Sequence, residues 1–216
     1  MKVNILGQQN SVFSDFIAEI RDVKIQGDSM RFRRNLERIG EVFAYEISKE
    51  LGFRTHDIET PLGISKDQKI EQLPVLATIL RAGLPMHNGL LNYFDRSPNA
   101  FVSAYRRDLP AGGFDVKVEY LAAPSLEGCT LILSDPMLAT GQSMLLSYEA
   151  LLQRGTPSLS HIVAAIASEQ AMGYLKENLP SNTTLWVGAV DKELNDKAYI
   201  IPGLGDAGDL AFGNKL

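Results

Sequence analysis

Residues 130–144, with the sequence TLILSDPMLATGQSM, decide the fold class of this chain. The first four residues form an apolar run of strand length, which ends at an aspartate and a proline. The run ATGQS (139–143) then leads into SMLLSYEALLQRG (143–155), which predicts a helix with a glycine stop. We therefore expect a buried strand, a polar loop and a helix in this order.

The same alternation recurs along the chain. Apolar runs of strand length lie at 73–80, 100–105, 161–167 and 185–190, and helical patterns lie at 85–94 and 169–179. Short strands that are apolar on both sides and are separated by helices indicate a mostly parallel sheet flanked by helices. Ligands of such sheets bind beyond the carboxyl ends of the strands. We expect one α/β domain spanning residues 1–216.

A long amphipathic helix is predicted near the start of the chain, over residues 28–52. Asp28 and Ser29 supply a capping signal, and apolar residues then recur at steps of three and four. Arg31, Arg33 and Arg34 lie in its first turns, where the helix dipole does not favour positive charge. They form either a solvated face or a contact with an anion or another subunit.

Bulk properties exclude several classes of partner. The chain has 216 residues and a formal net charge of −5, with no basic block, so we expect no nucleic acid polymer as a ligand. No apolar run reaches transmembrane length, so we expect no membrane partner. The single cysteine, Cys129, fits a reducing compartment and a buried place at a strand entry. We expect a cytoplasmic protein.

The loop between the strand and the helix has the chemistry of a sugar-phosphate site. The helix after Gly141 offers unsatisfied N–H groups to a phosphate, and Thr140 and Ser143 add hydroxyl donors. Asp135 would repel a phosphate, but a carboxylate can accept two hydrogen bonds from a ribose diol. The loop therefore indicates ribose 5-phosphate. The alternative is an ordinary Asp-Pro turn followed by a threonine cap.

Two further segments place unusual residues near strand ends. Arg81, Ala82 and Gly83 follow the strand at 73–80, where Arg81 could bind an anion or form an ordinary strand-end salt bridge. The sequence DLPAGGFD (108–115) contains a proline and two adjacent glycines, which predict a long flexible hairpin arm over residues 105–121.

These motifs carry a family resemblance. The strand with DPMLATGQS resembles the phosphoribosyl-pyrophosphate (PRPP) loop of type I phosphoribosyltransferases. ILRAG (79–83), DPMLATG and YIIPGLGDAGD (199–209), together with RFRRNLERIGEVFAYE in the first long helix, resemble the uracil phosphoribosyltransferase family in particular. The resemblance extends from about residue 28 to residue 213. It implies a type I phosphoribosyltransferase fold with a C-terminal base-binding hood over residues 191–216.

The resemblance implies that uracil and PRPP give UMP and pyrophosphate in pyrimidine salvage, assisted by Mg²⁺ bound through PRPP rather than by the protein. Electrostatic stabilisation of an oxocarbenium-like transition state needs no covalent nucleophile. By resemblance the catalytic residues are Asp135, Arg81 and Arg106. The implied PRPP-binding residues are Arg81, Ala82, Gly83, Arg106, Asp135, Pro136, Met137, Leu138, Ala139, Thr140, Gly141, Gln142, Ser143 and Asp206. The implied uracil-binding residues are Ile200, Gly205, Asp206 and Ala207.

The hood suits a base that is read by backbone groups. Gly203, Gly205 and Gly208 allow the backbone to approach a planar ligand closely. An exocyclic amine would face a donor there, so uracil is favoured over cytosine. The resemblance further implies a homo-oligomer, a dimer or tetramer, and GTP as an effector in some family members.

The sequence also departs from the family pattern. Gln142 replaces a usual glycine, where its side chain either crowds the phosphate or adds a hydrogen bond, and a positive φ would strain it. Arg107 and its neighbours replace a more acidic run. His87 replaces a small or apolar residue, and we interpret it as a surface or helix-start histidine. Two other functions stay open: a relative acting on another nucleobase, and a PRPP or nucleotide sensor that has lost catalysis.

Overall fold

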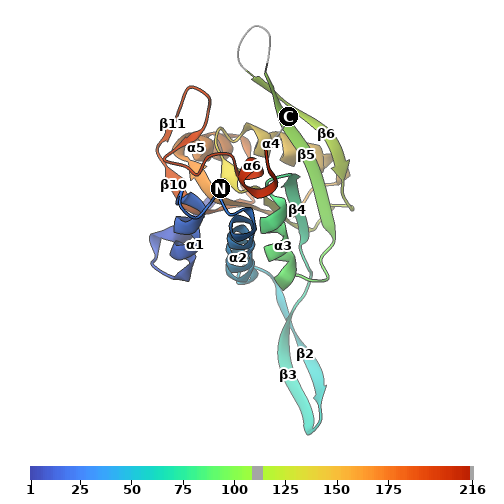
Figure 1. Ribbon diagram of the computed structural model, residues 1–216. Helices are drawn as coiled ribbons and strands as arrows, with labels where there is room; N and C mark the ends of the chain where they lie inside the picture. Colours follow the sequence, from blue (N-terminus) through green and yellow to red (C-terminus); the bar gives the residue numbers. More distant parts are fainter. Residues whose placement is uncertain (109–113, 215–216) are drawn as a thin grey trace.

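The structure is a computed structural model that describes residues 1–108 and 114–214. It describes only the backbone of residues 104–108 and 114–118. Its centre is a sheet in the order β1-β10-β9-β7-β4-β5-β6, with the short β8 added beside β9. All pairs are parallel except β5 with β6. The prediction of a mostly parallel sheet is confirmed (Figure 1).

The strands of this sheet are short. Their bounds are β1 Lys2–Ile5, β4 Val75–Leu80, β5 Asn99–Asp108, β6 Phe114–Ala122, β7 Thr130–Ser134, β8 Met137–Leu138, β9 Leu159–Ser168 and β10 Thr183–Asp191. The central strands β4, β7 and β9 are buried along nearly their whole length, as two-sided apolar runs require.

Helices cover both faces. On one face, α1 (Val12–Arg21), α2 (Ser29–Ser48), α3 (Leu84–Tyr93) and α6 (Ala207–Phe212) contribute to one core cluster. On the other face, α4 (Gln142–Leu151) and α5 (Glu169–Asn178) contribute to the second cluster. The remaining short elements are η1 (Leu6–Gln8), η2 (Leu152–Arg154), β11 (Glu193–Leu194) and β12 (Ile200–Ile201). Within the described ranges, no helix combines the length and apolar character needed to cross a bilayer.

The predicted helix at 28–52 is α2. The Asp28 carboxylate accepts hydrogen bonds from the backbone N–H groups of Met30 and Arg31, which confirms the predicted cap. Phe32, Leu36 and Ile39 are fully buried on its inner face, together with Phe43 and Ile47. Several turns of regular apolar spacing were therefore enough to place this helix.

The basic cluster at the start of α2 is partly exposed, with the Arg31 and Arg34 side chains 43% and 42% accessible, and all three arginines also make contacts within the chain. Arg31 forms a bidentate ion pair with Glu19 of α1: its Nε donates to Oε2 at 2.8 Å and its Nη2 donates to Oε1 at 2.7 Å. The Arg31 hydrogen bonds lower the pKa of Glu19 to about 2. Arg34 pairs with glutamates of its own helix, and Arg33 donates to the Ala211 carbonyl of α6 at 2.6 Å. The cluster thus fastens α2 to its neighbours.

The interpretation of His87 as a surface histidine is wrong, whereas its predicted place at a helix start is confirmed, since it lies in the first turn of α3. Its side chain is 1% exposed rather than on the surface, and its Nε2 lies 2.7 Å from Asn99 Oδ1 at the start of β5. Burial lowers the pKa of His87, which favours the neutral ring. Its partner comes twelve residues later in the chain, so nothing beside His87 in the sequence marks the contact.

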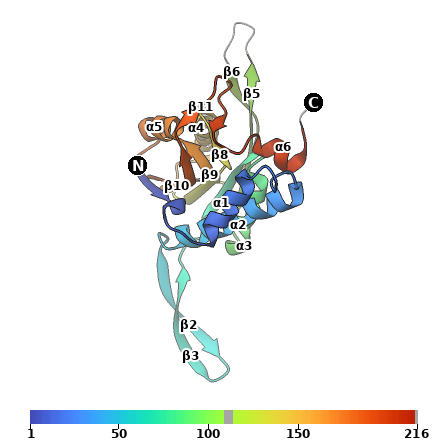
Figure 2. The same ribbon diagram turned by 60° about the vertical axis from the view of Figure 1, so that its left-hand side comes forward.

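A two-stranded ribbon formed by β2 (Phe53–Thr60) and β3 (Gly63–Ile70) projects away from the body in both views (Figures 1 and 2). The β5–β6 hairpin extends from the opposite end of the molecule. Pairing from Phe101 with Ala122 to Asp108 with Phe114 confirms the strands of the predicted arm at 105–121. The tip of the arm, 109–113, lies outside the described residues.

Candidate active site

The ends of β4 and β7 are joined by buried side chains. The Thr78 hydroxyl donates to the Ser134 carbonyl, and the Ser134 hydroxyl lies 3.2 Å from the Thr78 hydroxyl. Gly83 packs directly above this contact, and a Cβ there would lie 2.2 Å from Thr78 Oγ1. The loops that follow the two strands, with Arg81 on one and Asp135 on the other, are therefore held side by side.

The loop after β7 is fixed along β9. The backbone N–H of Asp135 donates to the Val163 carbonyl at 3.0 Å, and β8 pairs with β9 through Met137 and Leu138. Further on, the Ser168 hydroxyl donates to the Ala139 carbonyl. The sheet thus sets the course of the loop, which is why a short polar segment can adopt one defined shape.

Gly141 makes the turn into α4. Its φ is +81°, and a Cβ there would lie 3.0 Å from the Tyr174 ring and 3.2 Å from Leu175. Gly141 itself supplies no cap, but the Thr140 hydroxyl accepts a long hydrogen bond from the Gln142 N–H at 3.4 Å, so the threonine contact considered from the sequence is present. The N–H groups that follow in the first turn of α4 remain a site for an anion. Gln142 is the first residue of the helix and has no positive φ. The positive φ of this turn belongs to Gly141, a glycine that adopts it without strain, so Gln142 does not carry the backbone strain considered from the sequence.

A cleft of about 570 Å³ opens beyond the carboxyl ends of β4 and β7. Three parts of the chain meet in it: the loop after β4, the loop after β7, and the hood. The lining residues are Ile79, Leu80, Arg81, Ala82, Ser103, Asp135, Pro136, Met137, Ser143, Lys197, Ala198, Tyr199, Gly205, Asp206, Ala207 and Gly208.

Two carboxylates, those of Asp135 and Asp206, line this cleft. Desolvation, together with the nearby charge of Asp206, raises the pKa of Asp135 to about 8. Asp206 caps α6 by accepting from the Asp209 N–H at 3.0 Å. In the ligand-free site Asp135 is therefore largely protonated near neutral pH, and a ligand with hydroxyl or cationic groups would favour its ionised form.

Arg81 lies beside α6. Its Nη2 donates to Asp209 Oδ1 at 3.1 Å and to the Gly213 carbonyl at 3.2 Å. The strand-end salt bridge considered from the sequence is thus present. Both contacts use one nitrogen of the guanidinium group, and Arg81 still lines the cleft.

The hood reaches the cleft through a turn between β11 and β12. The Asn195 side chain accepts from the N–H groups of Lys197 and Tyr199, and Ala198 has a φ of +58°. This turn places residues 197–199 on the cleft wall. The peptide bonds Leu80–Arg81 and Ile201–Pro202 are cis.

The structure brings most of the sequence-predicted residues together. Those that line the cleft are Arg81, Ala82, Asp135, Pro136, Met137, Ser143, Gly205, Asp206 and Ala207. The predicted residues that do not line the cleft are Gly83, Leu138, Ala139, Thr140, Gly141, Gln142 and Ile200. Ile200 and Leu138 are 4% and 2% exposed, so both residues are buried in the ligand-free structure. The Arg106 side chain lies outside the described part of the structure.

Lining residues that sequence reasoning missed include Ser103, Lys197 and Ala198. Asn195-Asp196 is a turn signal, and it was the only available hint that residues 197–198 would lie at a turn. Ser103 belongs to a strand pattern that gives no information on which residue faces a ligand. Among the side chains that the structure describes, those of residues 1–103 and 119–214, no three His, Cys, Asp or Glu residues gather as a metal-binding group.

Fold and cleft together define an α/β protein with an anion-binding loop at the carboxyl edge of its sheet and a separate C-terminal segment over the cleft. The family model described as uracil phosphoribosyltransferase matches residues 8–214. This chain belongs to the uracil phosphoribosyltransferase family. The predicted type I phosphoribosyltransferase fold class is confirmed.

Individual relatives agree with this assignment. A uracil phosphoribosyltransferase of Porphyromonas gingivalis is 53% identical over 216 residues, which cover 100% of both chains. One of Pyrococcus furiosus is 37% identical over 208 residues, covering 94% of this chain and 86% of that protein. The solved structure of the AQ2163 protein from Aquifex aeolicus superposes with a TM-score of 0.87 at 26% identity, covering 99% of each chain.

Proposed function

We propose that this chain transfers the phosphoribosyl group of PRPP to uracil, giving UMP and pyrophosphate in pyrimidine salvage. One observation carries the proposal. Asp135, Ser143 at the start of α4, and the hood residues Gly205 and Ala207 line the same cleft of about 570 Å³. Sugar, phosphate and base sites would then be contiguous, as formation of a nucleoside monophosphate requires.

In this proposal the loop after β7 holds the ribose 5-phosphate. The 5′-phosphate would lie on the N–H groups of 138–143 and the hydroxyls of Thr140 and Ser143, and it would replace the long 3.4 Å contact between the Thr140 hydroxyl and the Gln142 N–H. Asp135 would hold the ribose diol as a carboxylate. Its raised pKa in the ligand-free site supports this role, because a hydrogen-bonding ligand would replace solvation that the carboxylate lacks.

The pyrophosphate would lie toward Arg81 and the Ala82 and Gly83 amides, with Arg106 of β5 as a second positive charge. As the bond from ribose to pyrophosphate breaks, negative charge develops on the leaving group and positive charge on the ribose. The arginines would stabilise the first and Asp135 the second, which is electrostatic catalysis by groups already in position.

Mg²⁺ fits this site as an ion carried by PRPP. Asp135 and Asp206 face the cleft and are close enough for the charge of one to raise the pKa of the other. Carboxylate oxygens are the protein ligands that Mg²⁺ prefers, and it usually binds through few of them together with substrate phosphates. When bound, Mg²⁺ would spread the negative charge of the pyrophosphate.

The hood would select the base. A Cβ on Gly205 would meet nothing within 4 Å, and its φ of +93° is one that glycine adopts freely. The space beside its backbone is therefore open for a planar base, with Ala207 and the Ile200 backbone nearby. Carbonyl and N–H groups of uracil could pair with this backbone, whereas the amine of cytosine would face a donor.

Purified protein mixed with uracil, PRPP and Mg²⁺ tests the proposal by chromatographic detection of UMP. Cytosine and hypoxanthine in place of uracil test the base. The expected result is that uracil gives UMP and that neither cytosine nor hypoxanthine gives a nucleotide. Turnover with hypoxanthine would support the alternative that this enzyme acts on another nucleobase. PRPP binding without any turnover would support the alternative that the protein is a sensor that has lost catalysis.

We also propose a homo-oligomer, a dimer or tetramer, in which the β2–β3 ribbon contacts a second copy of the chain. An isolated two-stranded ribbon is marginal in water. This ribbon nevertheless exposes Leu62 fully, Ile64 to 65% and Phe53 to 47%. Burial of these side chains against another copy would explain an extended ribbon that has no core of its own.

Two further predictions stay proposals. GTP as an effector is tested by adding GTP to the same assay and following the rate at low uracil concentration. A cytoplasmic location is tested by fractionating cells that express the tagged protein.

A further inference from the structure

A buried ion pair outside the cleft holds the backbone of the hood. Arg21, the last residue of α1, donates from Nη1 and Nη2 to the two carboxylate oxygens of Asp191, at 2.8 and 3.0 Å. Asp191 is the last residue of β10. The side chains are 20% and 8% exposed, so water screens this pair far less than it screens a surface pair.

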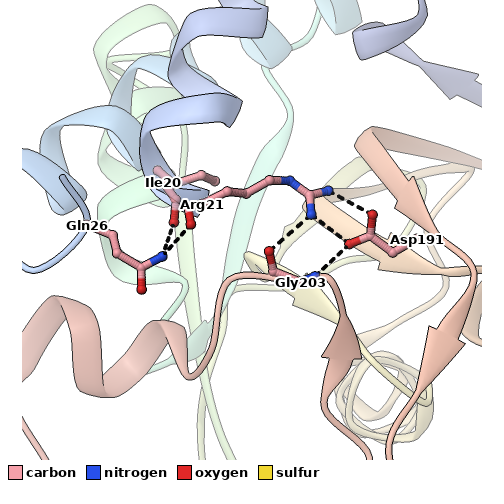
Figure 3. A network of polar contacts seen from close by, with 5 residues as sticks. All are labelled: Ile20, Arg21, Gln26, Asp191 and Gly203. Carbon is pink, nitrogen blue, oxygen red and sulfur yellow. Dashed lines mark hydrogen bonds and ion pairs between the residues drawn. The ribbon is translucent and has the colours of Figure 1, made fainter. Parts of the chain in front are cut away.

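The pair closes on Gly203 (Figure 3). Arg21 Nη1 also donates to the Gly203 carbonyl at 3.0 Å, and the Gly203 N–H donates to Asp191 Oδ2 at 3.1 Å. Both polar backbone groups of one hood residue are therefore bound by the same ion pair. Gly203 has a φ of +57°, and a Cβ there would lie 2.1 Å from the Ile200 carbonyl oxygen, so the turn leaves room for glycine alone.

The position of Arg21 is itself fixed. The Gln26 side chain donates to the carbonyls of Ile20 and Arg21 at 3.0 Å each, which satisfies the end of α1. Figure 3 shows Gln26 on the far side of Arg21 from Asp191. Helix end, strand end and hood turn are thus linked through one guanidinium group.

None of Arg21, Asp191 or Gly203 lines the cleft, so none of them contacts a ligand there. Gly205 and Asp206, which do line it, come two and three residues after Gly203. A displacement of the Gly203 backbone would therefore also displace Gly205 and Asp206, which would contact the base in the proposed function. Small displacements of positioning groups have large effects on reactions that depend on geometry.

We propose that Arg21 and Asp191 are positioning residues that hold residues 203–208 of the hood in the orientation that binds uracil. This inference rests on the proposed function, because it assigns the base to the hood. The pair contacts neither the loop after β7 nor Arg81 in its described hydrogen bonds. It follows that its loss affects the base more than PRPP.

The first experiment measures KM for each substrate in Arg21→Met and Asp191→Asn. We expect KM for uracil to rise by about tenfold or more and KM for PRPP to stay within about twofold. Arg21→Lys keeps the charge but not the fork geometry, so it should restore part of the uracil affinity. Lys24→Met is the matched control, since it removes an exposed positive charge three residues away.

A single variant leaves the other charge of the pair buried and could unfold. The double variant Arg21→Met/Asp191→Leu replaces the pair with apolar side chains, which proteins often tolerate. It removes both hydrogen bonds to Gly203 while leaving no unpaired charge. We expect it to stay folded and to show the same selective rise in KM for uracil.

Amide hydrogen exchange supplies a readout that does not depend on activity. In the double variant, peptides covering 196–208 should exchange faster, while peptides covering 130–145 should be unchanged. Equal increases in both KM values, an unchanged KM for uracil, or unchanged exchange in the hood would each overturn the inference. Absence of UMP formation by the unmodified protein would instead reject the proposed function, and exchange would still decide whether the pair holds the hood.

Discussion

Arg81 Nη2 lies 3.1 Å from Asp209 Oδ1, so the side chain at the end of β4 is held by the last helix of the chain. The two residues are 128 positions apart in the sequence, and Arg81 is also one of the residues that line the cleft. Because the same nitrogen also donates to Gly213, the rest of the guanidinium group can turn toward a bound anion.

The first prediction concerns this orientation of Arg81. Asp209→Asn should raise KM for PRPP by up to about fivefold, since partly exposed ion pairs contribute about 1 kcal/mol or less. KM for uracil should change little. Steady-state kinetics with each substrate varied in turn makes the measurement. A lower KM for PRPP would mean that Asp209 competes with the ligand rather than orienting Arg81.

Asp135 predicts a pH dependence for PRPP binding. With a pKa of about 8, the free carboxyl keeps its proton near pH 7, whereas the proposed ribose contact needs the carboxylate. Binding should therefore release a proton below pH 8, and affinity should rise by up to about tenfold per pH unit between pH 6 and 8. Above pH 8 this dependence should disappear.

Calorimetry in two buffers of different ionisation enthalpy measures the released proton directly. Asp135→Asn is the control, because it cannot titrate and should retain only the proton changes of PRPP itself. Identical proton release in the unmodified protein and in this variant would contradict the assignment.

Gly83 predicts a steric effect at the junction of two loops. Gly83→Ala places a methyl group 2.2 Å from Thr78 Oγ1 and should lower the free energy of unfolding by roughly 1–3 kcal/mol. Gly173→Ala in α5 is the matched control, since nothing lies within 4 Å of its Cβ, and it should stabilise the helix by up to about 1 kcal/mol. Urea unfolding compares the two. Equal effects would mean that crowding at Gly83 is relieved by movement of Thr78.

His161 predicts acid sensitivity of the fold. The ring is fully buried, and its Nδ1 accepts from Trp186 Nε1 at 3.0 Å. Desolvation lowers its pKa from 6.5 to about 4. Between these two values the unfolded chain binds a proton that the folded chain does not, so the free energy of unfolding should decrease by about 3 kcal/mol as the pH falls through this window.

His161→Gln keeps an acceptor for Trp186 and removes the titration. Urea unfolding at pH 7 and pH 4.5, followed by the fluorescence of the single tryptophan, should show a smaller pH effect in this variant than in the unmodified protein. The same loss of stability in both proteins would assign the acid sensitivity to other groups. His87 would then be the next group to test, because burial lowers its pKa as well.

The exposed ribbon predicts a change of assembly. Replacing Leu62 and Ile64 with serine should lower the mass measured by light scattering from that of an oligomer to that of a monomer. Val23→Ser is the control, because Val23 is 83% exposed on the body of the protein rather than on the ribbon. A monomeric unmodified protein, or an unchanged mass in the ribbon variant, would refute the proposed contact.

The sequence predicted the parts of this protein that obey short-range rules. Phe32, Leu36 and Ile39 mark the buried face of α2 by their spacing, and the apolar run before Asp135 marks β7 by its length. The motifs around Arg81, Asp135 and Gly205 could be assigned to one cleft because parallel strands share a carboxyl edge.

Other features depend on contacts that no local pattern records. The β2–β3 ribbon was not predicted, because its strands are mostly exposed and lack the apolar alternation of a half-buried sheet. The pairing of Arg31 with Glu19, and of His87 with Asn99, joins residues on different elements. Arg21 carried no signal at all, since its partners Asp191 and Gly203 lie at the other end of the chain.

The cleft is divided along the sequence as well as in space. The described lining residues up to Ser143 include those proposed to hold the sugar, phosphate and pyrophosphate, and those from Lys197 to Gly208 belong to the hood, where Asp206 alone is assigned to PRPP as well as to the base. A change of nucleobase could thus arise by exchanging one short C-terminal cassette that keeps Asp206, while the rest of the donor-substrate site is inherited intact. Such a transplant would have to bring a matching residue at position 21, or the new cassette would lose its anchor.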